Sequence, residues 1–436
     1  MPADWCEEYK RKLISAEEAA GLVKNRDVVL FTVGRETFAV GFALAARKEE
    51  LKDVEIVVPT PGYDFGWYDE GWEDSFSITI GHPTAVCQDA LDAGRINMRP
   101  WPLFTLARPS VRSERPPDFL LVELSPPDEK GFCSFGASLW NKKRDVELAK
   151  VVIAEVNDNL IRTHGDNFIH VSQIDYFVEH IGSGKGLRTG SLAGREVKEP
   201  EPYIRTIAEN VGSIMRDCDT FQIGVGRITE HLVQLGMLAN KQDLGYHAEA
   251  TPSGIITAVK EGVINGKYKT LFPNKVVATS LGGGTVEEME WANGNPLFWL
   301  VDIDFLEDAR TLASLDNLVA INQALAIDLR GQVASESLGY RTLSQAGGQI
   351  PFHTGALLSK GGRAITVLPS TAQGGKVSRI VPGLPEGTVV TIPYTCADYV
   401  VTEYGIARLW NKTLRQRKEE LINIAHPDFR SELRKA

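Results

Sequence analysis

The chain has few cysteines and no long apolar run. Its five cysteines are far apart and form no CxxC pair, so neither a disulfide framework nor a structural zinc site is expected. No apolar segment approaches the ~20 residues that span a bilayer, and the charged residues 1–11 are not followed by an apolar signal core. Metal-ligand spacing is also missing, so no metal is predicted. We expect a cytoplasmic protein without a membrane partner.

Basic clusters are missing as well. The net charge of the 436 residues is -10, and the longest basic passage, residues 412–418, is followed directly by Glu419 and Glu420. Binding of phosphate backbones requires clustered lysine and arginine, so the composition argues against a nucleic-acid partner.

Strand-like apolar runs are plentiful. Since 43% of the residues are hydrophobic, the chain can bury large cores, and ~100–200 residues per domain would give two or three domains. Predicted strands, several of them nearly continuous in apolar residues, cover residues 54–58, 119–124, 151–156, 276–279, 297–301, 365–369 and 389–392. Such runs are typical of mostly parallel sheets covered by helices on both faces, where ligands bind at the carboxyl ends of strands.

The chain contains an internal repeat. An apolar run leads into Val33-Gly34-Arg35 and then a helical pattern at 38–46, and a second run leads into Val225-Gly226-Arg227 and a helical pattern at 228–235. Helix-like stretches at 16–23 and 203–215 precede the two runs. This pattern predicts two related α/β halves, which we place at 1–190 and 200–436, joined by a Gly- and Pro-rich linker at 185–200.

Glu249 is the most informative single residue. It lies between Gly245 and Gly254, in a context that favours a carboxylate at the end of a strand, facing a cleft, where it could act as a nucleophile or general base. The alternative is a surface glutamate in a loop. His247, two residues earlier, is interpreted as structural.

Three glycine-rich segments are candidate ligand loops. The turn Gly224-Val225-Gly226-Arg227-Ile228 could present backbone N–H groups to a phosphate or oxyanion, although it is only a partial dinucleotide fingerprint. Residues 346–356 could bring backbone donors to a carbonyl or form plain turns, and residues 370–379 have the composition of a phosphate-binding loop.

Seven segments in order resemble the acetyl-CoA hydrolase/transferase family of class I CoA-transferases, which includes 4-hydroxybutyrate and butyryl-CoA:acetate CoA-transferases. They are Ser125-Pro126-Pro127-Asp128 with Gly131 and Gly136, Ile153-Ala154-Glu155-Val156-Asn157, Gln222 to Gly226, His247-Ala248-Glu249, Gly347-Gly348-Gln349-Ile350, Leu368 to Ala372 and Asp398 to Gly405.

The resemblance implies two pseudo-repeated open α/β domains with mostly parallel sheets, of the CoA-transferase-like type. It implies ping-pong transfer of CoA between an acyl-CoA and a free carboxylic acid, with Glu249 as the nucleophile that carries a glutamyl-CoA thioester. The turn from Gly224 to Ile228 falls on the family's CoA-binding loop. Gly348, Gln349 and Lys376 fall on segments that contact CoA or the thioester carbonyl. The resemblance implies no permanently bound cofactor. It does imply a homodimer or a higher homo-oligomer.

Some residues depart from the family pattern. Ala248, Ala250 and Pro351 replace a hydroxyl residue, a larger apolar residue and an acid, respectively, and the hypothesis is a roomier acyl pocket. The aromatic residues of 63–68 could line that pocket or pack in the core. An acyl-CoA hydrolase on the same scaffold and a non-catalytic CoA sensor are the alternative functions.

Overall fold

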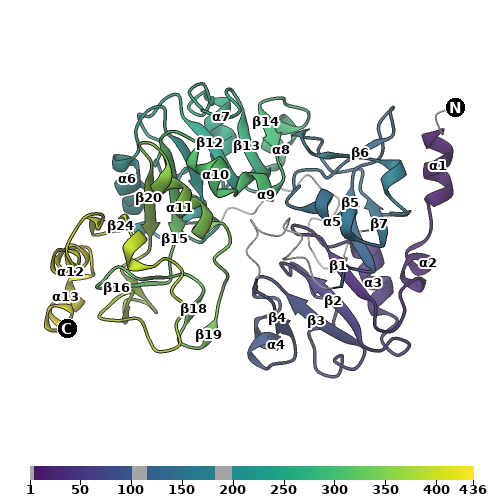
Figure 1. Ribbon diagram of the computed structural model, residues 1–436, viewed down its shortest axis with the longest axis horizontal. Helices are drawn as coiled ribbons and strands as arrows, with labels where there is room; N and C mark the ends of the chain where they lie inside the picture. The colour runs from purple at the N-terminus through teal and green to yellow at the C-terminus, as the bar shows by residue number, and fades with distance from the viewer. Residues whose placement is uncertain (1–3, 101–114, 182–198) are drawn as a thin grey trace. The chain divides into compact units, whose positions relative to one another are not determined.

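The computed structural model describes residues 4–100, 115–181 and 199–436. It divides into two compact units (Figure 1), the first formed by Met1–Gly194 with Met289–Asp304 and the second by Arg195–Glu288 with Phe305–Ala436. The bounds of the units fall within helices α8 (Val286–Ala292) and α9 (Ile303–Leu306). The predicted linker at 185–200 lies mostly outside the described residues.

The first unit is built on a parallel sheet with the strand order β10-β7-β5-β1-β2-β3-β4. Its strands are β1 (Val28–Phe31), β2 (Val54–Val58), β3 (Phe76–Ile80), β4 (Asn97–Met98), β5 (Phe119–Leu124), β7 (Val151–Val156) and β10 (Tyr176–Glu179). All six residues of β5 are buried, as expected for an apolar strand covered on both faces. Two smaller pairs are β6 (Phe132–Ser134) with β9 (Phe168–His170), and β8 (His164–Gly165) with β14 (Phe298–Leu300).

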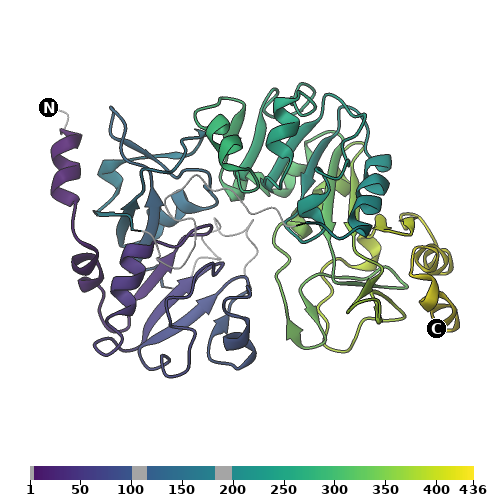
Figure 2. The same cartoon turned by 180° about the vertical axis from the view of Figure 1, so that it is seen from behind.

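Helices of the first unit are α1 (Trp5–Lys12), α2 (Ala16–Gly21), α3 (Phe38–Ala45), α4 (Gln88–Asp92) and α5 (Lys142–Leu148). α2 begins at a capping box of Ser15 and Glu18 and packs against α3 (Figure 2). Their apolar faces join the sheet and the aromatic residues Tyr63, Phe65, Trp67 and Tyr68 in one hydrophobic core. These aromatic side chains are therefore core residues of this unit.

The second unit has a sheet with the order β25-β24-β20-β15-β11-β12-β13. The strands are β11 (Thr220–Ile223), β12 (Gly245–Ala250), β13 (Val276–Ser280), β15 (Leu318–Gln323), β20 (Arg363–Val367), β24 (Tyr399–Thr402) and β25 (Gly405–Arg408). Only the β24–β25 pair is antiparallel among them. The order β20-β15-β11-β12-β13 repeats the order β7-β5-β1-β2-β3 of the first unit, so the predicted pseudo-repeated α/β fold is confirmed.

In each sheet the strand order reverses at the central strand. After β1 the chain adds β2 and β3 on one side and β5 and β7 on the other, and after β11 it does the same with β12, β13, β15 and β20. Ligands of open α/β sheets bind outside the carboxyl ends of strands at such a switch point. In the second unit, the amide side chains of Gln222 and Asn322 exchange two hydrogen bonds of 3.1 Å across it.

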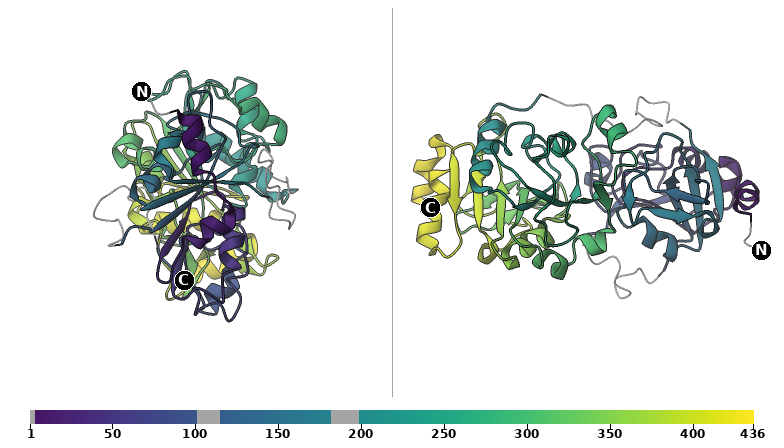
Figure 3. Two further views of the ribbon diagram at one scale, coloured as in Figure 1. Left: turned by 90° about the vertical axis from the view of Figure 1, so that its right-hand side faces the viewer. Right: turned by 90° about the horizontal axis from the view of Figure 1, so that it is seen from above.

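The helices of the second unit cover its sheet. They are α6 (Tyr203–Ile214), α7 (Ile255–Lys260), α10 (Ala309–Ala313), α11 (Gln349–Leu358), α12 (Leu414–Asn423) and α13 (Pro427–Lys435). α11 packs on β15 and β20, and the C-terminal helices, yellow in Figure 3, pack at the β25 edge. Short strands form three small sheets, β16 (Ala326–Asp328) with β17 (Val333–Ala334) and β23 (Ile380–Val381), β18 (Ser337–Leu338) with β19 (Arg341–Thr342), and β21 (Thr371–Ala372) with β22 (Val377–Ser378).

Two predicted elements are wrong. Residues 228–235 form only the 3₁₀ helix Thr229–His231 followed by turns, because their backbone hydrogen bonds span three, four and five residues, as in Leu232 to Thr229 and Met237 to Leu232. Residues 389–392 are predicted to form a strand but make only an isolated bridge between Ile392 and Val333. They belong to a loop that passes beside a small sheet. Within the described ranges, no helix is both long and apolar enough to cross a membrane.

Candidate active site

Glu249 lies near the carboxyl end of β12, between the parallel strands β11 and β13. All six residues of β12 are buried, and Glu249 itself is only 8% exposed. Carboxylates are rarely buried without partners, because the charged form loses its hydration. The alternative of a surface glutamate is therefore wrong, and the strand-end position that the glycine pattern predicts is confirmed.

The backbone at Gly348 contacts the Glu249 carboxyl directly. Its N–H donates a hydrogen bond to that carboxyl, and Gly348 is the N-terminal cap of α11. A side chain at this position would collide, since a methyl group on Gly348 would lie 2.8 Å from Glu249 Cδ and 2.9 Å from Oε2. The preceding Gly347 has φ +51°, a left-handed conformation that L side chains rarely adopt. The glycine pair thus lets a backbone donor reach the carboxyl.

Glu307 is a second acid at the same place, and the sequence reasoning missed it. Its side chain is fully buried, and its carboxyl lies within hydrogen-bonding reach of the carboxyl of Glu249. Burial raises the pKa of Glu249, and the hydrogen bonds from Glu307 and Gly348 lower it in part. The sequence did contain a signal for Glu307, because this acid directly follows the apolar residues Phe305-Leu306. An acid beside a buried apolar residue is unusual unless its carboxyl has a partner.

His247 holds the segment that carries Glu307. Burial lowers the pKa of the imidazole to about 3, so the ring is neutral. Its Nε2 lies 3.2 Å from the carbonyl oxygen of Leu306, which can only accept, so the ring donates this bond. The interpretation of His247 as a structural residue agrees with this arrangement.

The predicted turn at Gly224 to Ile228 lies at the switch point, after β11. The backbone N–H of Ile228 donates to Gln323 Oε1 at 2.8 Å, and a methyl group on Gly226 would lie 2.7 Å from the same oxygen. Val225 is 65% exposed, and the exposed Arg227 pairs with Glu201 at 2.7 Å. The glycines thus allow the turn to pack closely against β15. The 3₁₀ helix that follows is short, so it lacks the dipole with which a long α-helix would favour an anion.

Gln349 and Lys376 have different environments. Gln349 is buried at the first turn of α11, and its amide nitrogen has no hydrogen-bond partner among the described residues. Lys376 is exposed in the turn between β21 and β22, and no ion pair within the described ranges joins it to Glu249. The structure therefore brings Glu249, Gly348 and Glu307 together and leaves Lys376 and the Gly224 turn without a direct bond to them.

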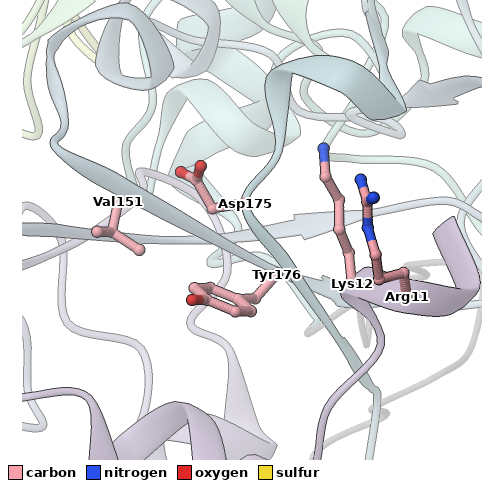
Figure 4. A pocket seen from close by; sticks show the side chains of 5 residues that line it. All are labelled: Arg11, Lys12, Val151, Asp175 and Tyr176. Carbon is pink, nitrogen blue, oxygen red and sulfur yellow. The ribbon is translucent and has the colours of Figure 1, made fainter. Parts of the chain in front are cut away.

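None of these residues lines the pocket that the structure shows in the first unit. Arg11, Lys12, Val151, Asp175 and Tyr176 line it (Figure 4), and Val151 and Tyr176 are the first residues of β7 and β10. It is therefore at the amino ends of parallel strands, the edge opposite to the usual ligand edge. Asp175 already accepts a 2.8 Å bond from the N–H of Val152. Over the described part of the chain, no group of three or more His, Cys, Asp or Glu residues could hold a metal ion.

Comparisons with known proteins identify the family of the chain. Residues 3–182 match the family model of the acetyl-CoA hydrolase/transferase N-terminal domain, and residues 284–436 match that of the C-terminal domain. The chain is 42% identical over 434 residues to the 4-hydroxybutyrate coenzyme A transferase of Clostridium kluyveri, covering 99% of this chain and 98% of that protein.

Two solved structures are similar over nearly the whole chain. RipA of Yersinia pestis superposes with a TM-score of 0.89 at 28% identity, and a 4-hydroxybutyrate CoA-transferase of Porphyromonas gingivalis with 0.77 at 32%. Each comparison covers 99% of this chain and 98% of the other. The predicted resemblance, fold and enzyme class, a CoA-transferase, are confirmed. The chain belongs to the acetyl-CoA hydrolase/transferase family.

Proposed function

We propose that this enzyme moves CoA between carboxylic acids by a ping-pong mechanism, with Glu249 as the nucleophile that carries a glutamyl-CoA thioester. The observation that carries the proposal is the buried carboxyl of Glu249 at a strand end, hydrogen-bonded by the Gly348 N–H. A partly desolvated carboxylate beside a fixed backbone donor has the properties of an oxygen nucleophile in acyl transfer.

In the first half-reaction, a Glu249 oxygen attacks the carbonyl carbon of the acyl-CoA. The C–S bond breaks, which gives a mixed anhydride on Glu249 and free CoA thiolate. The thiolate then attacks the glutamyl carbonyl carbon, and the acyl group leaves as a carboxylate. In the second half-reaction, an acceptor carboxylate attacks the glutamyl thioester, and the thiolate released attacks the acceptor's acyl carbon. Charge is conserved throughout, and the Glu249 carboxylate is regenerated.

Each attack on the glutamyl carbonyl places negative charge on its oxygen. The N–H of Gly348, at the start of α11, already donates to the carboxyl of Glu249. Removing one such preorganised donor costs about 10²–10³-fold in kcat in a well-studied protease. Gly348 is therefore the proposed oxyanion donor. The unpaired amide of buried Gln349 is a proposed donor to the ligand carbonyl.

The other proposed contacts are to CoA itself. Val225 and Arg227 project from the turn Gly224 to Ile228 at the switch point, where the nucleotide part of CoA could lie. The exposed Lys376 is proposed as a counter-charge for a CoA phosphate. These contacts would supply remote binding energy that holds the reacting carbonyl against Glu249. We also propose CoA-transferase-like domains at 1–190 and 200–436 and a cytoplasmic homodimer or higher homo-oligomer.

The substrate class follows from the relatives. Two of them are named 4-hydroxybutyrate CoA-transferases, so a short hydroxy acid is the first acyl group to test. We also propose a roomier acyl pocket, because the chain has Ala248, Ala250 and Pro351 where the family pattern has other residue types. Branched and cyclic acids are the probes for it.

The direct test is to trap the thioester. The enzyme is incubated with 4-hydroxybutyryl-CoA without an acceptor, reduced with borohydride and digested for peptide mass analysis. We expect the mass change on Glu249, no change in Glu249→Gln, and normal labelling in the exposed control Glu261→Gln. A label on a different residue would refute the proposed nucleophile.

The same experiment separates the alternative functions. If free CoA is released at the turnover rate without any acceptor acid, water resolves the thioester and the enzyme is a hydrolase. If no acyl-CoA of a broad panel labels the protein or turns over, while CoA still binds, the chain is a sensor. Acceptor-dependent turnover with the label on Glu249 supports the transferase.

A further inference from the structure

Two acids share one buried place in the second unit. Glu307 is fully buried, Glu249 is 8% exposed, and their carboxyl groups lie within hydrogen-bonding reach of each other. Both approach the α-carbon of Gly348 closely enough that a methyl group there would overlap each carboxyl. Among the described residues, no lysine or arginine forms an ion pair with Glu249.

A hydrogen bond between two carboxyl groups requires a proton. Ionised carboxylates only accept hydrogen bonds, and two of them in contact repel each other strongly in a site that excludes water. The resting pair therefore holds one proton. Glu249 accepts the N–H of Gly348, which favours its charged form, so the proton resides on Glu307.

The neighbouring titratable groups do not change this conclusion. His247 is neutral and its ring nitrogen is engaged by Leu306. The Lys269 amine contacts backbone carbonyl oxygens of Tyr246 and Lys275, and burial lowers its pKa to about 7. Glu230 accepts from Ser253, and the Tyr246 hydroxyl donates to the carbonyl of Ala250.

Asp308, the chain neighbour of Glu307, is engaged elsewhere. Its carboxylate caps α10 by accepting from the N–H groups of Arg310 and Thr311, and its pKa is lowered to about 2, chiefly by the Arg310 side chain. Of the acids around this segment, the side chain in hydrogen-bond contact with Glu249 is that of Glu307.

We propose that Glu307 is a second catalytic residue, an acid whose O–H donates a hydrogen bond to the Glu249 oxygen that becomes an oxyanion during thioester formation and breakdown. The inference rests on the proposed function, with Glu249 as the nucleophile. When the CoA thiolate attacks the glutamyl carbon, the carbonyl electron pair moves to that oxygen, between the Gly348 N–H and the Glu307 O–H. The oxyanion then collapses, the carboxylate leaves, and the proton stays on Glu307.

The test compares three variants of the full chain. Glu307→Gln keeps a donor of similar shape that does not titrate, and Glu307→Leu removes the donor. Asp308→Asn is the matched control on the adjacent residue, since asparagine also caps helices well. We measure kcat/KM from pH 5 to 10, thioester trapping on Glu249, and the melting temperature of each variant.

The wild type should show a bell-shaped pH profile set by the two ionisations of the pair. Glu307→Gln should stay within about 10-fold of wild type at its optimum and lose the alkaline decline, because its donor cannot ionise. Glu307→Leu should lose about 10²–10³-fold in kcat, the usual effect of removing an oxyanion donor. Asp308→Asn should leave the profile unchanged.

Contradicting outcomes can be distinguished. If Glu307→Leu turns over at the wild-type rate, or if Glu307→Gln keeps the alkaline decline, Glu307 is not the donor, whatever the state of Glu249. If the wild type carries no thioester on Glu249, the proposed function itself fails. Should Glu307→Leu not fold, the pH profile of Glu307→Gln alone decides the question.

Discussion

At the scale of single residues, the site depends on a glycine that leaves room and on acids that share a proton. Gly348 has φ -75°, a conformation open to any L residue, so its lack of a side chain reflects the space that Glu249 and Glu307 occupy. A carboxyl group held in this way is oriented by the backbone rather than by a long flexible side chain. Such orientation is what acyl transfer requires of a nucleophile.

Gly348→Ala should therefore damage catalysis with little change in helix α11. The added methyl group would lie 2.8 Å from Glu249 Cδ, so the carboxyl must move by a fraction of an ångström or more. We expect kcat to fall by about 10²-fold or more, as for other misplaced catalytic groups. Gly383→Ala, where a methyl group would meet nothing within 4 Å, is the control. Equal kcat values in both variants would argue against this role.

Glu249→Gln should raise stability at neutral pH. The pKa of Glu249 is raised in the folded protein, chiefly by burial, so the folded state binds more protons than the unfolded state between the two pKa values. Stability is therefore lost as pH rises through that interval, by about 1.4 kcal/mol for each unit of the shift. The variant should melt higher than wild type at pH 8 and show a smaller difference at pH 4. A difference independent of pH would contradict this expectation.

At the scale of elements, the switch point of the second unit is held by an amide pair. Gln222 on β11 and Asn322 on β15 are buried, and Gln222 Oε1 also accepts from the N–H of Ile321 at 3.2 Å. Gly224 follows β11 so closely that a methyl group would overlap the Asn322 amide. The pair thus sets the spacing of the two central strands, from which the Gly224 to Ile228 turn emerges.

Asn322→Ala should destabilise the protein by about 1–3 kcal/mol, because it leaves the buried Gln222 amide without its partner. Urea unfolding followed by circular dichroism measures the change. The control is Gln242→Ala in an exposed loop, which should differ from wild type by less than ~0.5 kcal/mol. A similar loss in both variants would mean that the amide pair contributes nothing specific.

At the scale of the whole molecule, two α/β units repeat one strand order but carry different strand-end residues. In the first unit, the buried Glu155 accepts from the N–H groups of Phe38 and Ala39 at the start of α3. In the second, Gln323 accepts from Ile228 after β11, and the neighbouring strand β12 carries Glu249. The same topology therefore supports a structural acid in one unit and the candidate nucleophile in the other.

CoA should stabilise the whole chain against heat by binding the folded state. At a CoA concentration of 100 times Kd, the expected gain is ~2.7 kcal/mol. Arg227→Ala should reduce the shift in melting temperature at a fixed CoA concentration, because it removes an exposed cation from the proposed CoA turn. Arg415→Ala on α12, which is also exposed and is paired with Glu419, is the control. If both variants respond like wild type, Arg227 does not bind CoA.

The amino-acid sequence alone determined the family, the alternating strands and helices, and the position of Glu249 at a strand end. These are local properties, since each depends on residues that are close neighbours in the chain, such as the nearly continuous apolar run of β5 or the glycines around β12. The same local reading was wrong for residues 228–235, where apolar residues at helical spacing pack into turns because tertiary contacts outweigh helix propensity.

Only the tertiary structure decided what surrounds Glu249. Glu307 and Gly348 come from distant parts of the chain and meet Glu249 because β12, the segment before α10 and the start of α11 pack together in one unit. A shared proton needs two carboxyl oxygens in direct contact inside a site that excludes water. Spacing along a sequence does not encode such a contact, because it forms only when separate elements fold against each other.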